Sequence, residues 1–136
     1  MSVREPDPEL LAAAREAHLQ AYCPYSHYRV GAAIRTASGS VVVGCNVENA
    51  AYPLGSCAEA GAIAAMVVGG ERDIVEMVVV TDGDQPATPC GGCRQRIREF
   101  AGPGVAVHSV AASGVVWSMT VADSLPHSFG PEFLID

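Results

Sequence analysis

The sequence has no long apolar run and few basic residues. No apolar run reaches the roughly 18 residues of a membrane-spanning helix, and the first six residues lack the apolar core of a signal peptide. We therefore expect a soluble, cytoplasmic protein without a membrane partner. Lys and Arg together number eight, and the net charge is −7, which argues against a surface that follows the phosphates of a nucleic acid.

Cysteine is also scarce, and three of the five cysteines fall in two short stretches. These are Cys57-Ala58-Glu59 and Pro89-Cys90-Gly91-Gly92-Cys93. Zinc favours thiolate ligands, and a catalytic zinc takes three protein ligands and leaves the fourth place for water. No fourth Cys or His stands at ligand spacing. We therefore predict one zinc ion per chain, held by Cys57, Cys90 and Cys93 in a reducing compartment that keeps these thiols out of disulfides.

Glu59 stands two residues after the first predicted ligand. Zinc lowers the pKa of a bound water from about 15.7 toward about 7, which supplies a nucleophile, but the attack still needs a group that carries protons. We predict that Glu59 is this catalytic residue. A ligand, any residue and Glu, followed by Pro-Cys-x-x-Cys, is the signature of zinc-dependent nucleobase deaminases.

Both cysteine stretches also look like the starts of helices. Ser56 is a candidate N-cap for a helix over 57–68, and Pro89 precedes a helical run over 90–100. A helix start directs free N–H groups and the positive end of the helix dipole forward, which favours thiolates over thiols. Two helix starts that face one metal would therefore hold its three anionic ligands.

The rest of the chain alternates between helical and extended patterns. Asp7 is a good N-cap, and Pro8 suits the first position of a helix whose buried face would carry Leu11, Ala14, Ala17 or His18, and Ala21. Apolar runs predict five strands, at residues 30–36, 41–46, 74–81, 105–110 and 115–119, and a short helix after Thr120. The strand between the two zinc helices implies a parallel crossover. We predict one α/β domain over residues 1–136, a mixed five-stranded sheet flanked by helices.

Four separated motifs span about residues 20 to 133. They are Tyr22-Cys23-Pro24-Tyr25-Ser26 with Val30-Gly31-Ala32-Ala33, the run from Asn46 to Glu59, the run from Pro89 to Gln95, and Leu125-Pro126 with Ser128-Phe129-Gly130-Pro131. Together they resemble the small, homotetrameric, zinc-dependent cytidine deaminases. The resemblance implies the cytidine-deaminase-like fold and a hydrolase of pyrimidine salvage, which converts the nucleosides cytidine and deoxycytidine to uridine and deoxyuridine and releases ammonia.

The resemblance also implies which residues bind the nucleoside. The expected substrate-binding residues are Asn46, Glu48, Ala58, Tyr28, Tyr52 and Phe129. In the family, the residues matching Asn46 and Glu48 hydrogen-bond the ribose hydroxyls, and the backbone at Ala58 meets the base. The aromatic at Tyr28, usually Phe in the relatives, lines the pocket. The residue matching Phe129 reaches the active site of a neighbouring subunit, so each site of the homotetramer would be shared.

One position departs from the family pattern. Many relatives carry Arg directly after the catalytic Glu, and this chain has Ala60 there. Three thiolates and a hydroxide on Zn²⁺ sum to a charge of −2. We expect Arg94, next to the ligand Cys93, and the two helix dipoles to offset this charge.

The residues alone leave other interpretations open. The three cysteines could form a structural zinc site, or the Cys-x-x-Cys pair could be a redox pair. Asn46 and Glu48 could only fix their loop, and Tyr28 and Phe129 could be core aromatics. The same chemistry could serve nucleic-acid bases, which the acidic composition opposes, or a nucleoside antibiotic. A binding module without catalysis would have to explain Glu59.

Overall fold

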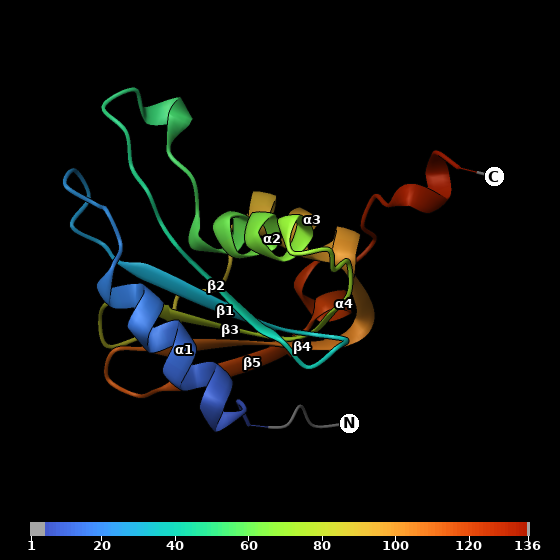
Figure 1. The fold of residues 1–136 in the computed structure, drawn as a ribbon, viewed down its shortest axis with the longest axis horizontal. Coiled ribbons are helices and arrows are strands. Elements are labelled where there is room, and N and C mark those ends of the chain that lie inside the picture. The colour runs from blue at the N-terminus through green and yellow to red at the C-terminus, as the bar shows by residue number, and fades with distance from the viewer. Residues whose placement is uncertain (1–4, 136) are drawn as a thin grey trace.

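The computed structural model describes residues 5–135, which form one sheet with helices on both faces (Figure 1). The helices are α1 (Pro8–Leu19), α2 (Ala58–Val68), α3 (Gly91–Phe100) and α4 (Val121–Ser124). The strands are β1 (Val30–Thr36), β2 (Val41–Cys45), β3 (Ile74–Thr81), β4 (Ala101–Ala111) and β5 (Val116–Thr120). Two short 3-10 helices are η1 (Tyr52–Leu54) and η2 (Pro131–Phe133). Within these residues, no helix is both long and apolar enough to cross a membrane.

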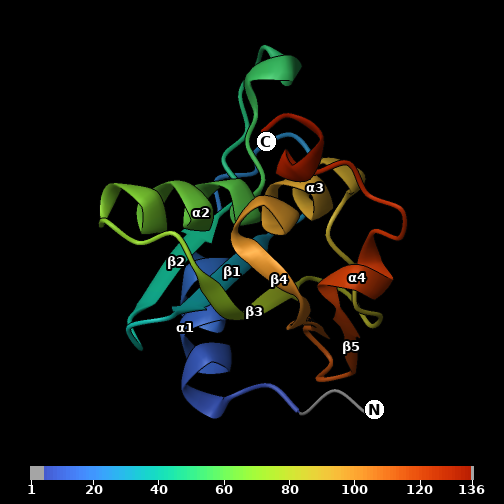
Figure 2. The same cartoon turned by 90° about the vertical axis from the view of Figure 1, so that its right-hand side faces the viewer.

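The sheet is mixed, as the sequence predicts. Its strand order is β2-β1-β3-β4-β5. β3 and β4 pair in parallel through the α3 crossover, and the other three pairs are antiparallel. In two views at right angles, α1 lies on one face of the sheet and α2 and α3 lie on the other (Figures 1 and 2). The fold is the predicted five-stranded α/β arrangement.

The central strand β3 is buried on both faces. Met77 and Val79 belong to the core cluster under α2 and α3, and Val78 and Val80 belong to the cluster under α1. Successive side chains of a strand point to opposite faces, so a continuous apolar run is what a strand covered on both sides requires.

The two long helices that flank the sheet approach it closely over glycines. A Cβ on Gly31 of β1 would overlap the backbone of α1 at His18, and a Cβ on Gly44 of β2 would lie 2.5 Å from the carbonyl oxygen of Ala58 in α2. No side chain fits at either place. Gly44 therefore sets how close the helix that carries Glu59 comes to the sheet.

Several sequence predictions need correction at element boundaries. β2 ends at residue 45 and not at 46, and β5 covers residues 116–120 and not 115–119. α1 buries Leu10, Ala14, Ala17 and His18, so Leu11 lies beside the buried stripe, and Ala21 lies beyond the end of the helix. The N-cap of α2 is Cys57 and not Ser56, because the backbone of Ser56 is held extended by two hydrogen bonds to Val47. β4 begins at Ala101 and not at Val105. A register shift between β3 and β4 accommodates Pro103, which has no N–H for a regular ladder.

Candidate metal centre and active site

The three predicted zinc ligands meet at the starts of α2 and α3. Cys57 is the N-cap of α2, Cys90 is the N-cap of α3, and Cys93 lies in the first turn of α3. Their sulfur atoms all lie within 4.8 Å of one another. Zinc–sulfur bonds of about 2.3 Å in a tetrahedron place sulfur atoms about 3.8 Å apart, so small side-chain adjustments bring the three onto one ion. The donor set and its geometry fit zinc.

The surroundings of the three thiols differ. Burial raises the pKa of the Cys57 and Cys93 thiols, whereas the backbone N–H of Cys93 lowers the pKa of Cys90, which is exposed. Cys57 and Cys90 are the N-cap residues of the two helices, so they lie directly in front of the helix starts. Both helix starts therefore direct their first N–H groups and positive dipole ends toward the cluster, where thiolate ligands need positive charge.

Glu59 lies in the first turn of α2, beside this cluster. Its side chain is almost entirely buried, with 4% exposure. Burial raises the pKa of its carboxyl, and the positive charge of Arg96 and a hydrogen bond with Cys93 act in the opposite direction without cancelling the shift. A raised pKa brings a carboxyl closer to the working pH, which favours both accepting and returning a proton in general acid–base catalysis.

A cavity of about 340 Å³ opens in front of the cluster. Its lining includes the ligands Cys57 and Cys90 and the carboxyl of Glu59, with Val79 and Thr81 contributed by the central strand. Five of the six expected substrate-binding residues also line it, namely Tyr28, Asn46, Glu48, Tyr52 and Ala58. Residues separated by up to 62 positions in the chain thus line one small cavity that two of the cysteines border. Sequence reasoning did not single out Val79 and Thr81, because they look like ordinary strand residues.

Asn46 and Glu48 shape this cavity through the loop in front of β1. Asn46 accepts a hydrogen bond from the Val30 N–H at Oδ1 and donates from Nδ2 to the Tyr28 carbonyl, both at 2.9 Å. Oε1 of Glu48 accepts from the N–H groups of Tyr25 (3.0 Å) and Ser26 (3.1 Å). In the chain by itself both side chains therefore fix the loop that carries Tyr28.

Phe129 is not brought to the cavity of its own chain. It lies in the segment after α4, is 55% exposed, and stacks on Phe133 with ring centroids 5.5 Å apart. Gln95 of α3 anchors the segment, because its Nε2 donates to the Phe129 carbonyl at 2.9 Å. The segment extends away from the sheet in Figure 1. A role for Phe129 in a nucleoside site thus requires a second subunit.

The guanidinium of Arg94, expected from sequence to help offset the thiolate charge, makes its hydrogen bonds to groups other than the cysteine sulfurs within the described residues. It donates to the carbonyls of Pro89 and Ser124, each at 2.8 Å, and to Oγ1 of Thr88 at 2.7 Å. Arg94 follows Cys93 directly, and adjacent residues on a helix point in different directions. The arginine at the cluster is Arg96, whose Nη1 lies 3.7 Å from Sγ of Cys93. The i, i+3 spacing from Cys93 to Arg96 could have indicated this from sequence.

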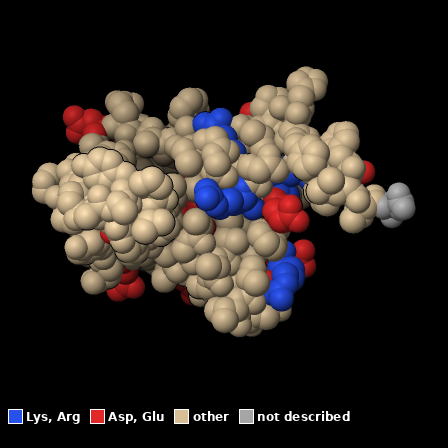
Figure 3. All heavy atoms as spheres, turned by 90° about the horizontal axis from the view of Figure 1, so that it is seen from above, with Lys and Arg blue, Asp and Glu red and all other residues tan. Residues whose placement is uncertain are grey.

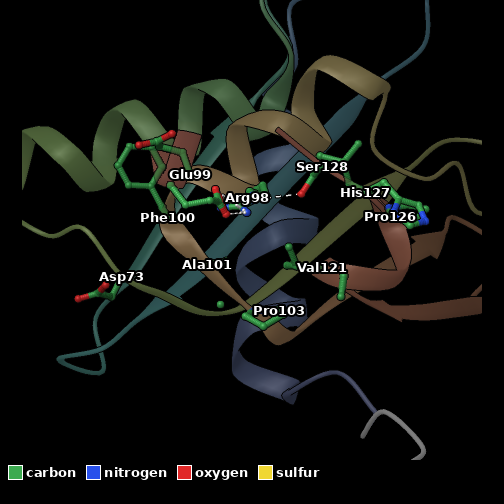
Figure 4. A pocket seen from close by; sticks show the side chains of 14 residues that line it. Asp73, Arg98, Glu99, Phe100, Ala101, Pro103, Val121, Pro126, His127 and Ser128 are labelled. Atoms are coloured by element: carbon green, nitrogen blue, oxygen red, sulfur yellow. Dashed lines mark hydrogen bonds and ion pairs between the residues drawn. The ribbon is translucent and has the colours of Figure 1, made fainter. Parts of the chain in front are cut away.

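A second, larger cavity lies elsewhere, between the carboxyl end of α3, the start of β4 and the segment after α4 (Figure 4). Its volume is about 620 Å³. Arg98 crosses it, donating to Oγ of Ser128 at 3.0 Å and pairing with Glu132 at 2.7 Å. It contains no cysteine and its one arginine is already paired, so the smaller cavity beside Glu59 is the candidate active site despite its size.

Comparison with known proteins agrees with this geometry. The family model described as the cytidine and deoxycytidylate deaminase zinc-binding region matches residues 4–109. The cytidine deaminase of Sporosarcina psychrophila is 40% identical over 126 residues, which cover 93% of each chain. That of Halalkalibacterium halodurans is 39% identical over 127 residues, covering 93% of this chain and 96% of the relative. The crystal structure of cytidine deaminase from Burkholderia pseudomallei, 38% identical, superposes with a TM-score of 0.87 over 92% of this chain and 100% of that one.

Proposed function

Because this chain belongs to the cytidine deaminase family, we propose that it hydrolyses cytidine and deoxycytidine to uridine and deoxyuridine, with release of ammonia. The observation that carries the proposal is a buried carboxyl, Glu59, beside three cysteines that can hold one metal ion, at the end of a cavity. Ammonia release by water is a hydrolytic reaction, so the enzyme is a hydrolase.

Cys57, Cys90 and Cys93 would hold the zinc ion, which supplies a water nucleophile at neutral pH. The new bond joins the water oxygen to the ring carbon that bears the amine, and the bond that breaks joins this carbon to the amine. Glu59 would take one proton from the water and pass it to ring nitrogen 3. It would then take the second proton of the same water, as its oxygen becomes the carbonyl of the product, and pass it to the departing amine, which leaves as ammonia. Its raised pKa suits both directions of transfer.

The remaining cavity residues would select the substrate. The backbone of Ala58, a fully buried residue, would face the pyrimidine, while Tyr28 and Tyr52 would form the walls. Asn46 and Glu48 would bind the sugar hydroxyls, which requires their side chains to share or exchange the loop hydrogen bonds that they make. A carboxylate near the sugar repels a phosphate, so nucleotides should be poor substrates.

We further propose a cytoplasmic homotetramer in which Phe129 completes the active site of a neighbouring subunit. Support comes from the exposure of Phe129 and Phe133, 55% and 68%, on a segment that stands away from its own cavity. Large aromatic side chains with this exposure are typical of subunit contacts.

Replacement of the proton carrier tests the proposed chemistry. Glu59→Gln keeps the shape of the side chain and removes its proton transfer, so we expect zinc content near one per chain and turnover reduced by at least about 100-fold. Glu16→Gln, at an exposed position of α1, is the matched control and should keep both. Turnover near the wild-type rate in Glu59→Gln would show that Glu59 does not carry the protons.

A substrate panel tests the specificity. Cytidine and deoxycytidine should release ammonia, whereas cytosine, adenosine and a cytidine-containing oligonucleotide should not. Activity on the oligonucleotide would move the assignment to a nucleic-acid deaminase.

Mixed oligomers test the shared site. Phe129→Ala alone should weaken use of cytidine, and mixing with subunits that carry Glu59→Gln and an intact Phe129 should partly restore it. No effect of Phe129→Ala would remove the shared-site proposal.

A further inference from the structure

The side chain of Arg96 folds back along its own helix toward the cysteine cluster. Nη1 of Arg96 lies 3.7 Å from Sγ of Cys93, within hydrogen-bonding range for sulfur. The path runs over Gly92, where an added Cβ would lie 3.2 Å from the same nitrogen. Helical side chains lean toward the helix start, so the arginine three residues after a ligand reaches back to that ligand, and glycine leaves the space for it.

The other arginines of the part of the chain that the structure describes have different neighbours where contacts are seen. Arg29 pairs with Asp82, Arg35 with Asp7 and Glu9, and Arg98 with Glu132. Arg94 and Arg72 donate to backbone carbonyls. Basic side chains gather near the middle of the face that carries α2 and α3 (Figure 3). Among the arginines of the described residues, Arg96 is the one whose side chain contacts a predicted ligand sulfur.

The cluster needs a positive charge when it holds zinc. Three thiolates on Zn²⁺ leave a net charge of −1, and an ionised Glu59 nearby adds a second negative charge. α2 has no basic residue to balance them, because Ala60 follows Glu59 and the rest of the helix is apolar. The helix dipoles contribute only partial charges.

We propose that Arg96 is a positioning residue of the metal centre, whose guanidinium offsets the negative charge of the zinc–thiolate cluster through Cys93 and so tightens zinc binding. The inference rests on the proposed zinc site. Arginine suits this place, because its guanidinium keeps its charge at all working pH values and offers several donors to a large, polarisable sulfur. Hydrogen bonds to ligands from such neighbouring residues typically change metal affinity by about 10-fold to 100-fold.

Zinc affinity measured on the metal-free protein tests the proposal without using catalysis. Zinc is returned to the full chain in competition with a chromophoric chelator, for the wild type and for Arg96→Met, Arg96→Lys and Arg98→Met. Arg96→Met keeps the aliphatic stem and removes the charge, so its zinc dissociation constant should rise by about 10-fold or more. Arg96→Lys should recover part of this loss. Arg98→Met removes an arginine two positions along the same helix and should bind zinc as the wild type does.

A wild-type dissociation constant in Arg96→Met would overturn the proposal, as would an equal loss in Arg98→Met, which would indicate a general effect of charge on α3. Thermal unfolding of the metal-free variants checks that each is folded. Cytidine turnover at saturating zinc is recorded in parallel. Zinc binding that depends on Arg96 in a protein inactive on cytidine would support the role of Arg96 and reject the substrate, so the two failures can be told apart.

Discussion

α2 and α3 begin at the same cysteine cluster but differ in amino-acid composition and in burial. α2 has one charged residue, Glu59, among small and apolar ones, and five of its residues are buried. α3 has three arginines and buries only Cys93 and Ile97. Both have a cysteine at the N-cap. The metal centre thus lies between a core helix and a surface helix.

The difference assigns separate tasks to the two helices. α2 lies against the sheet over Gly44, which buries Glu59 and raises the pKa of its carboxyl. The arginines of α3 contact three different places. Arg96 contacts the cluster, Arg94 the loop before Cys90, and Arg98 the segment after α4. On α2, burial therefore raises the pKa of the carboxyl of Glu59, whereas α3 supplies the positively charged side chains.

The largest effect is expected where α2 meets the sheet. Gly44→Ala forces a methyl group against the backbone of Ala58 and Ala62, so α2 must move away with Cys57 and Glu59. We expect a loss of about 3 kcal/mol in the free energy of unfolding, together with weaker zinc binding. Denaturant unfolding and zinc content measure these changes.

Gly61→Ala is the control on the other side of the same interface. Its Cβ would make ordinary contacts at 3.7 Å, and alanine favours a helix over glycine by about 1 kcal/mol. This variant should therefore be as stable as the wild type or more stable. Equal stability of Gly44→Ala and Gly61→Ala would contradict the close approach of α2.

Arg94→Met tests the scaffolding task of α3. The change removes the donors to Thr88, Pro89 and Ser124, which join the loop before Cys90 to α4. We expect a loss of about 2 kcal/mol in unfolding free energy, because partly buried acceptors lose charged partners. Arg94→Lys should recover little of it, since one ammonium cannot reach all three acceptors. Full recovery by lysine would show that charge alone matters at this position.

Glu59→Gln should stabilise the metal-free protein while it abolishes turnover. Folding raises the pKa of this carboxyl, so the protonated group favours the folded state below pH 4.5, its ordinary pKa. This contribution is lost as pH rises through the folded-state pKa. Above that range the wild type carries an unfavourable buried charge, so the variant should be more stable at pH 7 by about 1 kcal/mol. Unfolding curves from pH 4 to pH 8 should diverge with increasing pH. Parallel curves would show that Glu59 is not destabilised by burial.

Ala60→Arg in the Arg96→Met background asks whether α2 can supply the charge that α3 has lost. Ala60 follows Glu59 in the first turn of α2, so a guanidinium there starts close to the cluster. We expect zinc affinity to recover by about 3-fold to 10-fold, a smaller change than the others. Chelator competition measures it, with Ala60→Met in the same background as the control for side-chain size. Recovery by Ala60→Met as well would exclude a charge effect.

The sequence was sufficient for the elements that local patterns determine. Asp7 and Pro8 correctly predicted the start of α1, and the apolar run from Ile74 to Thr81 matches β3. The cysteine spacing predicted a cluster that the structure brings together. These features depend on neighbouring residues or on ligand chemistry.

Prediction from sequence failed or stayed open where tertiary contacts determine the local structure. Ser56 is a good N-cap residue, but its pairing with Val47 moves the cap to Cys57. Arg96, which the sequence alone did not single out, is the arginine with a hydrogen bond to a ligand sulfur, because helical side chains lean toward the start of the helix. The sequence left open whether Asn46 and Glu48 fix their loop, because the hydrogen bonds that they make depend on a segment about 20 residues earlier in the chain. Neither secondary-structure propensities nor sequence motifs predict these contacts.

The most direct test measures zinc content per chain and ammonia release from cytidine in the same preparation. We predict one zinc per chain together with turnover of cytidine, since the cluster and Glu59 face one cavity. Zinc without turnover of any cytosine nucleoside would contradict the assigned substrate. A well-folded protein that takes up no zinc would contradict the metal centre on which the account depends.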